Sequence, residues 1–149
     1  MSNKSDEVMR LVKHTVSAWT LRDIDELMRY MAPNIDYYVN VDPKIAPFVA
    51  STSGAPALRA RLQLLLDTFE IQAFLAKDIK ISDEDPSVAR VNISYVYRER
   101  NTKECLDGSF RMIVHTADGM IVRIAEIHDS CYVEAFARLV HMMQDTTES

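Results

Sequence analysis

The sequence has few of the residues that stabilise proteins through disulfides or metal ions. It contains two cysteines, Cys105 and Cys131, and no Cys-x-x-Cys pair. Two thiols do not build a disulfide framework, and reduced thiols in a chain without a signal peptide indicate a cytoplasmic protein. No His-Glu-x-x-His motif occurs, and the histidines and cysteines lack metal-ligand spacing. We therefore expect no metal site.

Glycine is also scarce, with three residues in the whole chain. A phosphate-binding loop needs several glycines close together, and a serine hydrolase elbow needs a Gly-x-Ser-x-Gly motif. The sequence has neither pattern. A nucleotide cofactor and a covalent serine mechanism therefore have no support, and we expect the protein to act without a cofactor.

Positive charge and long apolar runs are lacking as well. The net charge is −5, and the nearest approach to a basic cluster, Arg98 with Arg100, is diluted by Glu99 and Glu104. Nucleic acid binding needs clustered positive charge, so a nucleic-acid partner is not expected. The apolar stretches are too short to span a bilayer, which argues against a membrane partner.

The N-terminal half has the periodicity of helices. The length of 149 residues and a hydrophobic content of 48% suit one domain over residues 1–149. Apolar residues at helical spacing predict a helix over about 6–20, with Ser5 as its N-cap. A second helix is predicted from Asp23, with Glu26 completing a capping box and Pro33 ending it. A third is predicted from Pro56 to about Phe69.

The rest of the chain alternates with a period of two. A short strand is predicted over 35–41, and a long apolar loop follows over 42–54. Four further strands are predicted over 73–82, 87–99, 104–116 and 120–129. Asp118-Gly119 is a strong signal for a two-residue hairpin. A last helix is predicted over 132–143 after Ser130, and the polar tail, 143–149, is expected to be frayed.

Helices followed by a long antiparallel meander indicate the α+β class, with helices packed on a curved antiparallel sheet. Several strands carry apolar residues on both faces, as Ile121, Val122 and Ile124 do on the last strand. Such a sheet must be covered on both sides, by helices on one and by a second subunit on the other. The sequence therefore predicts a homodimer.

Three segments resemble one known superfamily. The stretch from Asp23 through Leu27, followed by residues 31–35, is similar to its second helix running into the first strand. Pro47-Phe48 ahead of Gly54 resembles its loop into the third helix. Residues 118–129, which begin Asp-Gly-Met-Ile-Val-Arg, resemble its closing strand. The chain thus resembles the SnoaL-like, ketosteroid-isomerase-like branch of the nuclear transport factor 2-like superfamily.

The resemblance implies a cone-shaped α+β barrel in which a bent sheet wraps a long helix and leaves a mostly apolar pocket. It implies a small hydrophobic ligand, and the superfamily hosts isomerases, cyclases, dehydratases, hydrolases and non-catalytic binders. Ketosteroid isomerases use a tyrosine and a protonated aspartate as oxyanion donors. Their places fall near Thr15 and Phe110, which are not equivalent donors, so steroid isomerisation itself is not expected.

Two residues near the end of the last strand are candidates for acid–base chemistry. Glu126 and His128 are two positions apart, so both side chains should lie on one face of the strand. A histidine beside a carboxylate can exchange protons near neutral pH. The alternative is a histidine that closes the pocket mouth and hydrogen-bonds to backbone.

Asp42 before Pro43 is the third candidate catalytic residue. An Asp-Pro pair near this place supplies the general base of ketosteroid isomerases, and a desolvated carboxylate has the raised pKa that a base needs. However, Asp42 lies a few residues later than in that pattern, and Asp before Pro is a common turn opener. Turn chemistry explains the pair without any substrate, so the turn interpretation is favoured.

Aromatic and apolar residues from several elements are expected to line the pocket, although such residues also fill ordinary cores. The predicted wall consists of Trp19, Tyr38, Phe48, Phe69, Tyr95, Phe110 and Met112. Tyr38 is in addition a candidate hydrogen-bond donor to the ligand. Arg111, His115 and Arg123 have the opposite parity to Glu126 and His128, so they are assigned to the outer face or a dimer contact.

The sequence thus favours cofactor-independent acid–base chemistry, of isomerase, cyclase or dehydratase type, on a small hydrophobic carbonyl compound. His128 would be the main acid–base residue, with Glu126 or Asp42 as its partner. One alternative is a non-catalytic binding or accessory protein of the same fold. Another is a dimerisation module whose own side chains fill the cavity.

Overall fold

The computed structural model describes residues 4–148, with side chains through Asp145. The described residues form helices, one short 3₁₀ helix and strands, which in chain order are α1 (Lys4–Thr20), α2 (Ile24–Met28), β1 (Met31–Val39), η1 (Pro47–Val49), β2 (Thr52–Ser53), α3 (Ala55–Thr68), β3 (Phe69–Ile81), β4 (Val88–Glu99), β5 (Cys105–Ala117), β6 (Met120–His128) and α4 (Ser130–Glu148). The helical first third and the strand-rich remainder confirm the predicted α+β class.

The six strands form one sheet in the order β2-β1-β6-β5-β4-β3. The long meander from β3 to β6 is antiparallel, as the alternating pattern predicts, and Asp118 and Gly119 take the positive φ angles of 54° and 76° that a tight hairpin requires. β1 pairs with β6 in parallel, which differs from the antiparallel sheet predicted. A parallel pair needs a long crossover connection, and the whole segment from α3 to β5 supplies it.

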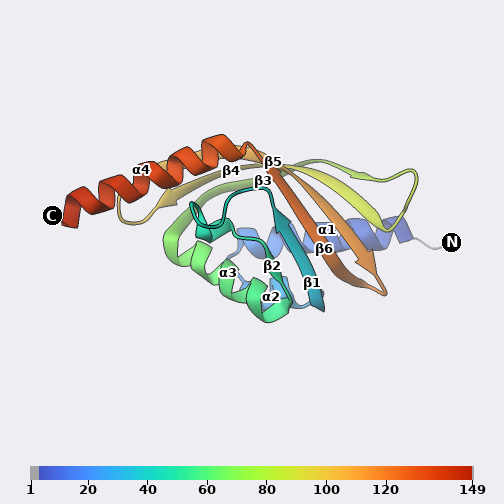
Figure 1. Cartoon of the computed structure of the whole chain (residues 1–149). Coiled ribbons are helices and arrows are strands. Elements are labelled where there is room, and N and C mark those ends of the chain that lie inside the picture. The colour runs from blue at the N-terminus through green and yellow to red at the C-terminus, as the bar shows by residue number, and fades with distance from the viewer. Residues whose placement is uncertain (1–3, 149) are drawn as a thin grey trace.

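The sheet bends around the N-terminal helices (Figure 1). α1 contacts β3 and β4, and α3 contacts β1 and β3, so both helices cover the same side of the sheet. The bent sheet and these helices enclose the cone-shaped interior that the resemblance implies. α4 follows β6 and packs on the core through Val133, Phe136 and Ala137, and its C-terminal end lies at the far left of Figure 1.

Residue parity decides which side chains enter the cone. On β4, Val91, Ile93 and Tyr95 are buried, whereas Arg90 and Asn92 between them are exposed. On β5 and β6 the outward positions include Arg111, His115 and Arg123, as predicted from their parity. The interior is therefore apolar because alternate positions of each strand are apolar.

Several element boundaries differ from the prediction. α2 ends at Met28, and Pro33 lies inside β1 instead of ending the helix. Pro33 has no N–H to donate, and the pairing of β1 with β6 is irregular between Met31 and Asp36. Ser5 lies within α1 and does not cap it. β3 begins at Phe69, directly after α3, four residues before the predicted start.

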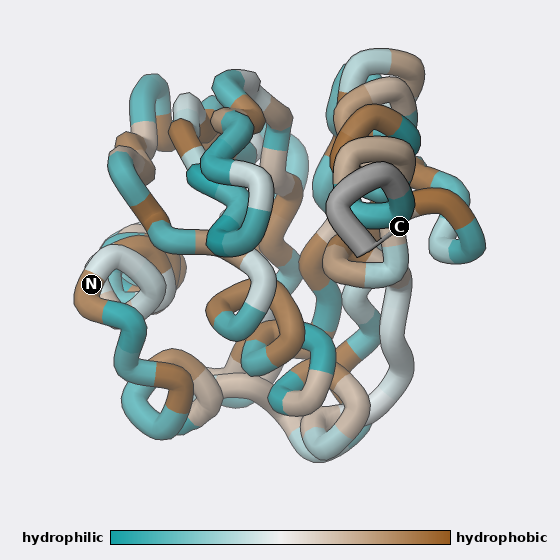
Figure 2. The backbone as a smooth tube through the Cα atoms, turned by 90° about the vertical axis from the view of Figure 1, so that its left-hand side faces the viewer, coloured by the Kyte–Doolittle hydropathy of each residue, from teal (hydrophilic) through white to brown (hydrophobic). Residues whose placement is uncertain are grey.

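α4 is longer than predicted and begins differently. Asp129 is its cap, because its Oδ1 accepts a hydrogen bond of 3.3 Å from the backbone N–H of Tyr132. The helix continues to Glu148, through most of the tail that was expected to be frayed, while Ser149 lies outside the described residues. His141 and Asp145 pair at 3.4 Å across one turn in this region. Hydrophobic and hydrophilic positions alternate along α4 (Figure 2).

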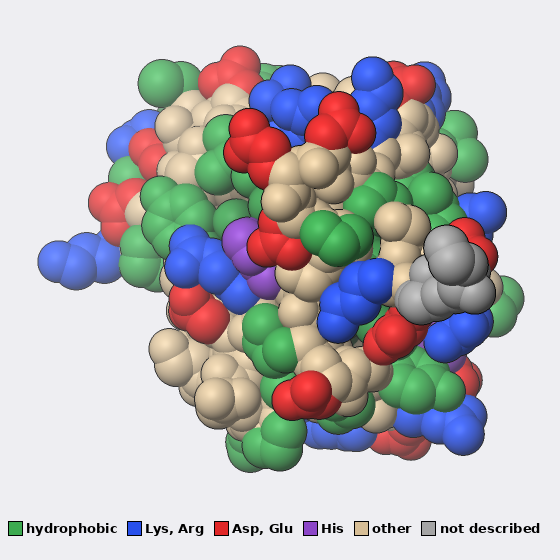
Figure 3. All heavy atoms as spheres, turned by 90° about the vertical axis from the view of Figure 1, so that its right-hand side faces the viewer, with side chains coloured by type: hydrophobic (Ala, Val, Ile, Leu, Met, Phe, Trp, Pro, Cys, Tyr) green, Lys and Arg blue, Asp and Glu red, His purple; other side chains and the backbone are tan. Residues whose placement is uncertain are grey.

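The surface has no single dominant charge on the face shown in Figure 3, where acidic and basic side chains are interspersed with apolar ones. Both cysteines are exposed and free. Within residues 4–148, no helix combines the length and the apolar character that crossing a bilayer requires.

The alternation of faces predicts how two neighbouring positions respond to truncation. Ile93 on β4 is 0% exposed, whereas Leu75 on the adjacent strand is 57% exposed. Ile93→Ala should lower the free energy of unfolding by about 2–5 kcal/mol, because it removes buried methyl groups and leaves a void. Leu75→Ala should change it by less than about 0.5 kcal/mol. Urea unfolding followed by circular dichroism measures both, and similar losses at the two positions would contradict this assignment of faces.

Candidate active site

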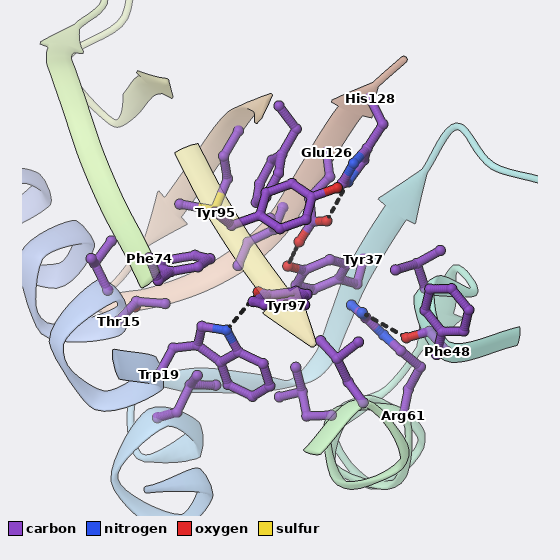
Figure 4. A pocket seen from close by; sticks show the side chains of 18 of the residues that line it. Thr15, Trp19, Tyr37, Phe48, Arg61, Phe74, Tyr95, Tyr97, Glu126 and His128 are labelled. Carbon is purple, nitrogen blue, oxygen red and sulfur yellow. Dashed lines mark hydrogen bonds and ion pairs between the residues drawn. The ribbon is translucent and has the colours of Figure 1, made fainter. Parts of the chain in front are cut away.

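The cone encloses a cavity of about 50 Å³. At roughly 10–15 Å³ each, this is room for about three to five water molecules, so a larger ligand requires side chains to move. Residues of α1, α2, η1, α3 and five strands form its wall, and most of their side chains are apolar. The polar groups belong to a few residues, of which Figure 4 labels Thr15, Trp19, Tyr37, Arg61, Tyr95, Tyr97, Glu126 and His128. A few polar groups in an apolar hollow is the usual composition of a small-molecule site.

Glu126 and His128 both point into this cavity from β6. His128 Nε2 lies 2.8 Å from Glu126 Oε1, and the side chains of His128 and Glu126 are 4% and 9% exposed, respectively. Asn40 holds the end of the strand in place, because its side chain accepts a hydrogen bond from the backbone N–H of His128 and donates one to the backbone oxygen of the same residue. The histidine is therefore fixed through both its backbone and its ring.

Tyr37 on β1 completes a chain of three residues. Its hydroxyl donates a hydrogen bond to Glu126 Oε2, the carboxylate oxygen that His128 does not contact (Figure 4). β1 and β6 lie side by side, with Tyr37 opposite Ile124 and Val39 opposite Glu126. Burial raises the pKa of Tyr37 well above its ordinary value, and the negative charge of Glu126 raises it further, so this phenol remains a donor.

Glu126 is ionised in spite of its burial. Burial by itself raises the pKa of a carboxyl group, but here the hydrogen bonds from His128 and Tyr37, together with the nearby positive charge of Arg61, outweigh it. The net result is a pKa of Glu126 below its ordinary value. An ionised carboxylate only accepts hydrogen bonds, so the hydrogen between Glu126 and His128 belongs to Nε2 of the imidazole.

This assignment leaves the other ring nitrogen of His128 open. In a neutral imidazole protonated at Nε2, Nδ1 carries a lone pair and can accept a proton. His128 Nδ1 is buried and has no hydrogen-bond partner among the described residues. The ring stacks on Phe110 at a centroid distance of 4.4 Å, directly across the β5–β6 pair. The geometry is that of a general base held by its opposite nitrogen.

Tyr97 and Trp19 form a second polar pair on another wall of the cavity. The indole N–H of Trp19 donates to the hydroxyl oxygen of Tyr97 at 2.9 Å. Burial raises the pKa of Tyr97, so its hydroxyl keeps its hydrogen. Within the chain segments whose side chains are described, that hydrogen has no acceptor. It is therefore available to an oxygen atom of a bound molecule.

Arg61 on α3 is a third polar feature of the wall. Only 6% of it is exposed, and its guanidinium carbon lies 4.7 Å from the centre of the Tyr37 ring. Its Nη1 donates to the backbone oxygen of Phe48 at 3.4 Å. Its Nε and Nη2 are buried, and neither has a hydrogen-bond partner within 3.5 Å in the described part of the chain, although the guanidinium lies close enough to Tyr37 to oppose the rise in the pKa of that phenol.

Most of the predicted wall residues line this cavity, and three predicted site residues do not. The structure places Trp19, Phe48, Tyr95, Phe110, Met112, Glu126 and His128 in the wall. Tyr38 instead lies on the outer face of β1 and is 42% exposed, so it cannot donate a hydrogen bond into the hollow. Phe69 is buried behind the wall, in edge contact with Phe48 at 4.9 Å.

Asp42 is also outside the cavity. Its side chain is exposed, and Oδ1 accepts a hydrogen bond of 2.9 Å from the backbone N–H of Lys44. Its own backbone N–H donates to Glu134 on α4. Asp42 therefore opens a turn, which is the favoured alternative for an Asp before proline. It does not lie beside His128, and Glu126 is the carboxylate that does.

The prediction missed Tyr37 and Arg61. For Tyr37 a signal existed, because Ile35 and Val39 are apolar and have its parity, whereas Asn34 and Asp36 share the parity of Tyr38. For Arg61 the signal is weaker. It lies three residues after Leu58 and four before Leu65, on the buried side of α3, but a single arginine at such a place is not distinctive in a sequence.

The described residues contain no group of three or more histidine, cysteine, aspartate or glutamate side chains arranged to hold a metal ion. The groups that can do chemistry are therefore the Tyr37–Glu126–His128 chain, the hydroxyl of Tyr97 and the free edge of Arg61. These can accept a proton, donate a hydrogen bond and bind negative charge, respectively.

The pKa of Glu126 predicts a pH-dependent stability. Because it is lowered below the ordinary value of 4.5, the ionised carboxylate stabilises the fold at higher pH, and this contribution is lost as the pH falls through the lowered pKa. Glu126→Gln should therefore be less stable than the wild type near neutral pH, and the difference should shrink toward about pH 3. Urea unfolding across this range measures it. Glu84→Gln, at an exposed turn, is the control, and a difference that is constant with pH would contradict the assignment.

Comparison with known proteins gives solved structures of the same fold. A provisionally named isomerase from Bacillus subtilis matches with a TM-score of 0.78 at 14% identity, over 90% of this chain and 94% of that chain. TerC, crystallised with polyporic acid, matches with a TM-score of 0.76 at 10% identity, over 89% of this chain and 98% of that chain. RV0760c from Mycobacterium tuberculosis, in complex with estradiol-17beta-hemisuccinate, matches with a TM-score of 0.70 at 9% identity, over 80% of this chain and 92% of that chain.

At these identities the structural matches establish the fold alone. The comparison with curated protein sequences gives no match. The model of the SnoaL-like domain family matches residues 12–124, which is more than half of the chain. These residues run from α1 to the middle of β6 and include Tyr37, Arg61 and Tyr97. The chain belongs to the SnoaL-like domain family.

Proposed function

We propose that this protein is a cofactor-independent acid–base enzyme, of isomerase, cyclase or dehydratase type, that acts on a small hydrophobic carbonyl compound. The observation that carries the proposal is the open Nδ1 of His128, in an apolar cavity, on a ring whose Nε2 is bonded to an ionised carboxylate. Family membership is in agreement, because a similar fold occurs in a provisionally named isomerase.

The first step is removal of a proton from the carbon next to the substrate carbonyl. The proton passes to Nδ1 of His128, and the electron pair of the C–H bond moves toward the carbonyl oxygen to form an enolate. The imidazolium that results lies beside the negative charge of Glu126, which stabilises it. Tyr37 keeps that carboxylate in place by occupying its second oxygen.

The enolate oxygen needs a hydrogen-bond donor, and the Tyr97 hydroxyl supplies one. Trp19 already donates to its oxygen, which orients the hydroxyl and strengthens it as a donor. The same donor stabilises the neutral carbonyl less, because the interaction grows with the negative charge on oxygen. His128 then returns the proton to a different carbon in an isomerisation. In a cyclisation the enolate carbon attacks a second carbonyl, and His128 gives the proton to the resulting alkoxide. In a dehydration the enolate expels the hydroxyl group of the β carbon, which takes the proton from His128 and leaves as water.

The alternative function is non-catalytic binding of a small hydrophobic molecule. It is favoured by structures of this fold that contain polyporic acid or estradiol-17beta-hemisuccinate, since those titles name a bound compound and no reaction. Both functions need the cavity, and they differ in whether His128 moves a proton. An assay of proton exchange separates them.

Exchange in D₂O is the direct test. Wild-type protein should catalyse incorporation of deuterium next to the carbonyl of at least one of a panel of small ketones, such as 2-indanone and 3-cyclohexenone, followed by mass spectrometry. His128→Gln should reduce the rate by about 10²–10⁴-fold, the usual contribution of a general base. His141→Gln replaces a histidine whose side chain is 76% exposed and should exchange at the wild-type rate.

Two results would contradict the enzymatic proposal. One is full exchange by a folded His128→Gln variant, which removes His128 from the reaction. The other is binding of these ketones by the wild-type protein, detected by calorimetry, without any exchange above buffer. The second result would support the non-catalytic function.

We also propose that the protein is a homodimer that uses the outer face of its sheet. Described helices cover the inner face, while on the outer face the adjacent strands β1 and β6 expose the apolar side chains of Tyr38 and Ile127. Burial of these side chains against a second copy would remove apolar surface from water.

Light scattering after size-exclusion chromatography tests the dimer. The wild-type protein at micromolar concentration should have twice the mass of the 17.0 kDa chain. Ile127→Lys should shift it toward the monomer, because the charge would lie in the apolar contact. Leu139→Lys, on the exposed side of α4, is the matched control and should remain dimeric. A monomeric wild-type protein would overturn the proposal.

A further inference from the structure

Arg61 has more hydrogen-bonding capacity than the protein uses. A guanidinium carries five N–H donors, and burial without acceptors is unfavourable for a charged group. Of the three nitrogens, Nη1 has an acceptor, the backbone oxygen of Phe48. Nε and Nη2 are buried and have no partner among the described residues. These two nitrogens form one edge of the guanidinium.

No carboxylate of the described residues forms an ion pair with Arg61 within 4 Å. Glu126 is the carboxylate in the same cavity, and its two oxygens already accept hydrogen bonds from Tyr37 and His128. The Tyr37 side chain separates the two charges, because Arg61 lies over its ring while Glu126 binds its hydroxyl (Figure 4). The protein thus holds a buried cation and leaves one edge of it unpaired.

We infer that Arg61 binds the carboxylate group of a small apolar acid, with the Nε and Nη2 hydrogens donated to the two carboxylate oxygens. The parallel donors of a guanidinium edge match the geometry of a carboxylate. The stack on Tyr37 and the hydrogen bond to Phe48 fix the plane of the guanidinium, so the side chain loses little conformational entropy when the ligand binds.

The other side chains of the wall indicate the polarity and the charge of the rest of the ligand. Val49, Leu62 and Leu65 line the cavity together with aromatic rings, so the body of the acid is apolar. A single negative charge suits the site better than a phosphate dianion, because Arg61 is the one arginine or lysine in the wall and Glu126 already contributes a negative charge. This inference deepens the proposed function, since it names the substrate class for the same cavity, and it rests on that proposal in taking the cavity as the ligand site.

Paired ligands test the inference without any turnover. Isothermal calorimetry would compare straight-chain carboxylates from butyrate to octanoate with their primary amides, which have nearly the same shape and no charge. The best carboxylate should bind the wild-type protein at least tenfold more tightly than its amide. Absence of carboxylate binding, or equal affinity for acid and amide, would overturn the inference.

Substitution then assigns the preference to Arg61. Arg61→Met keeps an unbranched side chain as long as the arginine stem up to Nε and removes the guanidinium, and it should bring the acid-to-amide ratio close to one. Arg59→Met, on the same helix, removes an arginine that is 48% exposed and paired with Asp25, and it should keep the wild-type ratio. A folded Arg61→Met variant with the wild-type ratio would overturn the inference. Arg61→Gln, with the same expected and contradicting results, replaces it if circular dichroism shows that Arg61→Met is unfolded.

Different results would contradict the enzymatic function and the carboxylate site at Arg61. Deuterium exchange into neutral ketones by a protein that does not distinguish acids from amides would remove the carboxylate site and leave the enzymatic function. Arginine-dependent binding of carboxylates by a protein that exchanges no deuterium into any compound would support the carboxylate site and remove the enzymatic function.

Discussion

The site depends on one ionised carboxylate kept away from water. Glu126 is almost fully buried in an apolar wall, and such a group is tolerated only when both of its oxygens are paired. Tyr37 pairs with one and His128 with the other, so each neighbour has its orientation set by the same charge. The tautomer of His128, the neutral state of Tyr37 and the open Nδ1 all follow from it. Removal of that charge would leave the Tyr37 hydroxyl and His128 Nε2 without the acceptor that orients them.

Much of the fold could be predicted because it depends on period and turn chemistry. The meander from β3 to β6 alternates regularly, and Asp118-Gly119 forms the hairpin that this pair favours. The ends of elements were predicted less well, because tertiary pairing moved them. β1 begins at Met31, before Pro33, since the segment pairs with β6 in spite of the missing N–H. The tail is helical to Glu148 although its composition is polar.

The site could be predicted only where strand parity decides it. Two residues on one strand, Glu126 and His128, must share a face, and the structure brings them together. Tyr37 and Arg61 come from other elements. Their distance from Glu126 depends on how β1 and α3 pack against the rest of the fold, which no local sequence pattern predicts. Asp42 illustrates the converse, because a residue that resembles a catalytic position by its neighbour Pro43 has its carboxylate committed to a turn.

The parallel pairing of β1 with β6 has a consequence for the newly synthesised chain. Tyr37 and Glu126 are 89 positions apart, so the edge of β1 that faces β6 has no partner until the residues of β6 have left the ribosome. An unpaired strand edge can join another chain, and contacts between distant segments form late because they must close a long loop. The acid–base pair is therefore among the last parts to assemble, and a chain interrupted before residue 120 exposes an unpaired strand edge and lacks both Glu126 and His128.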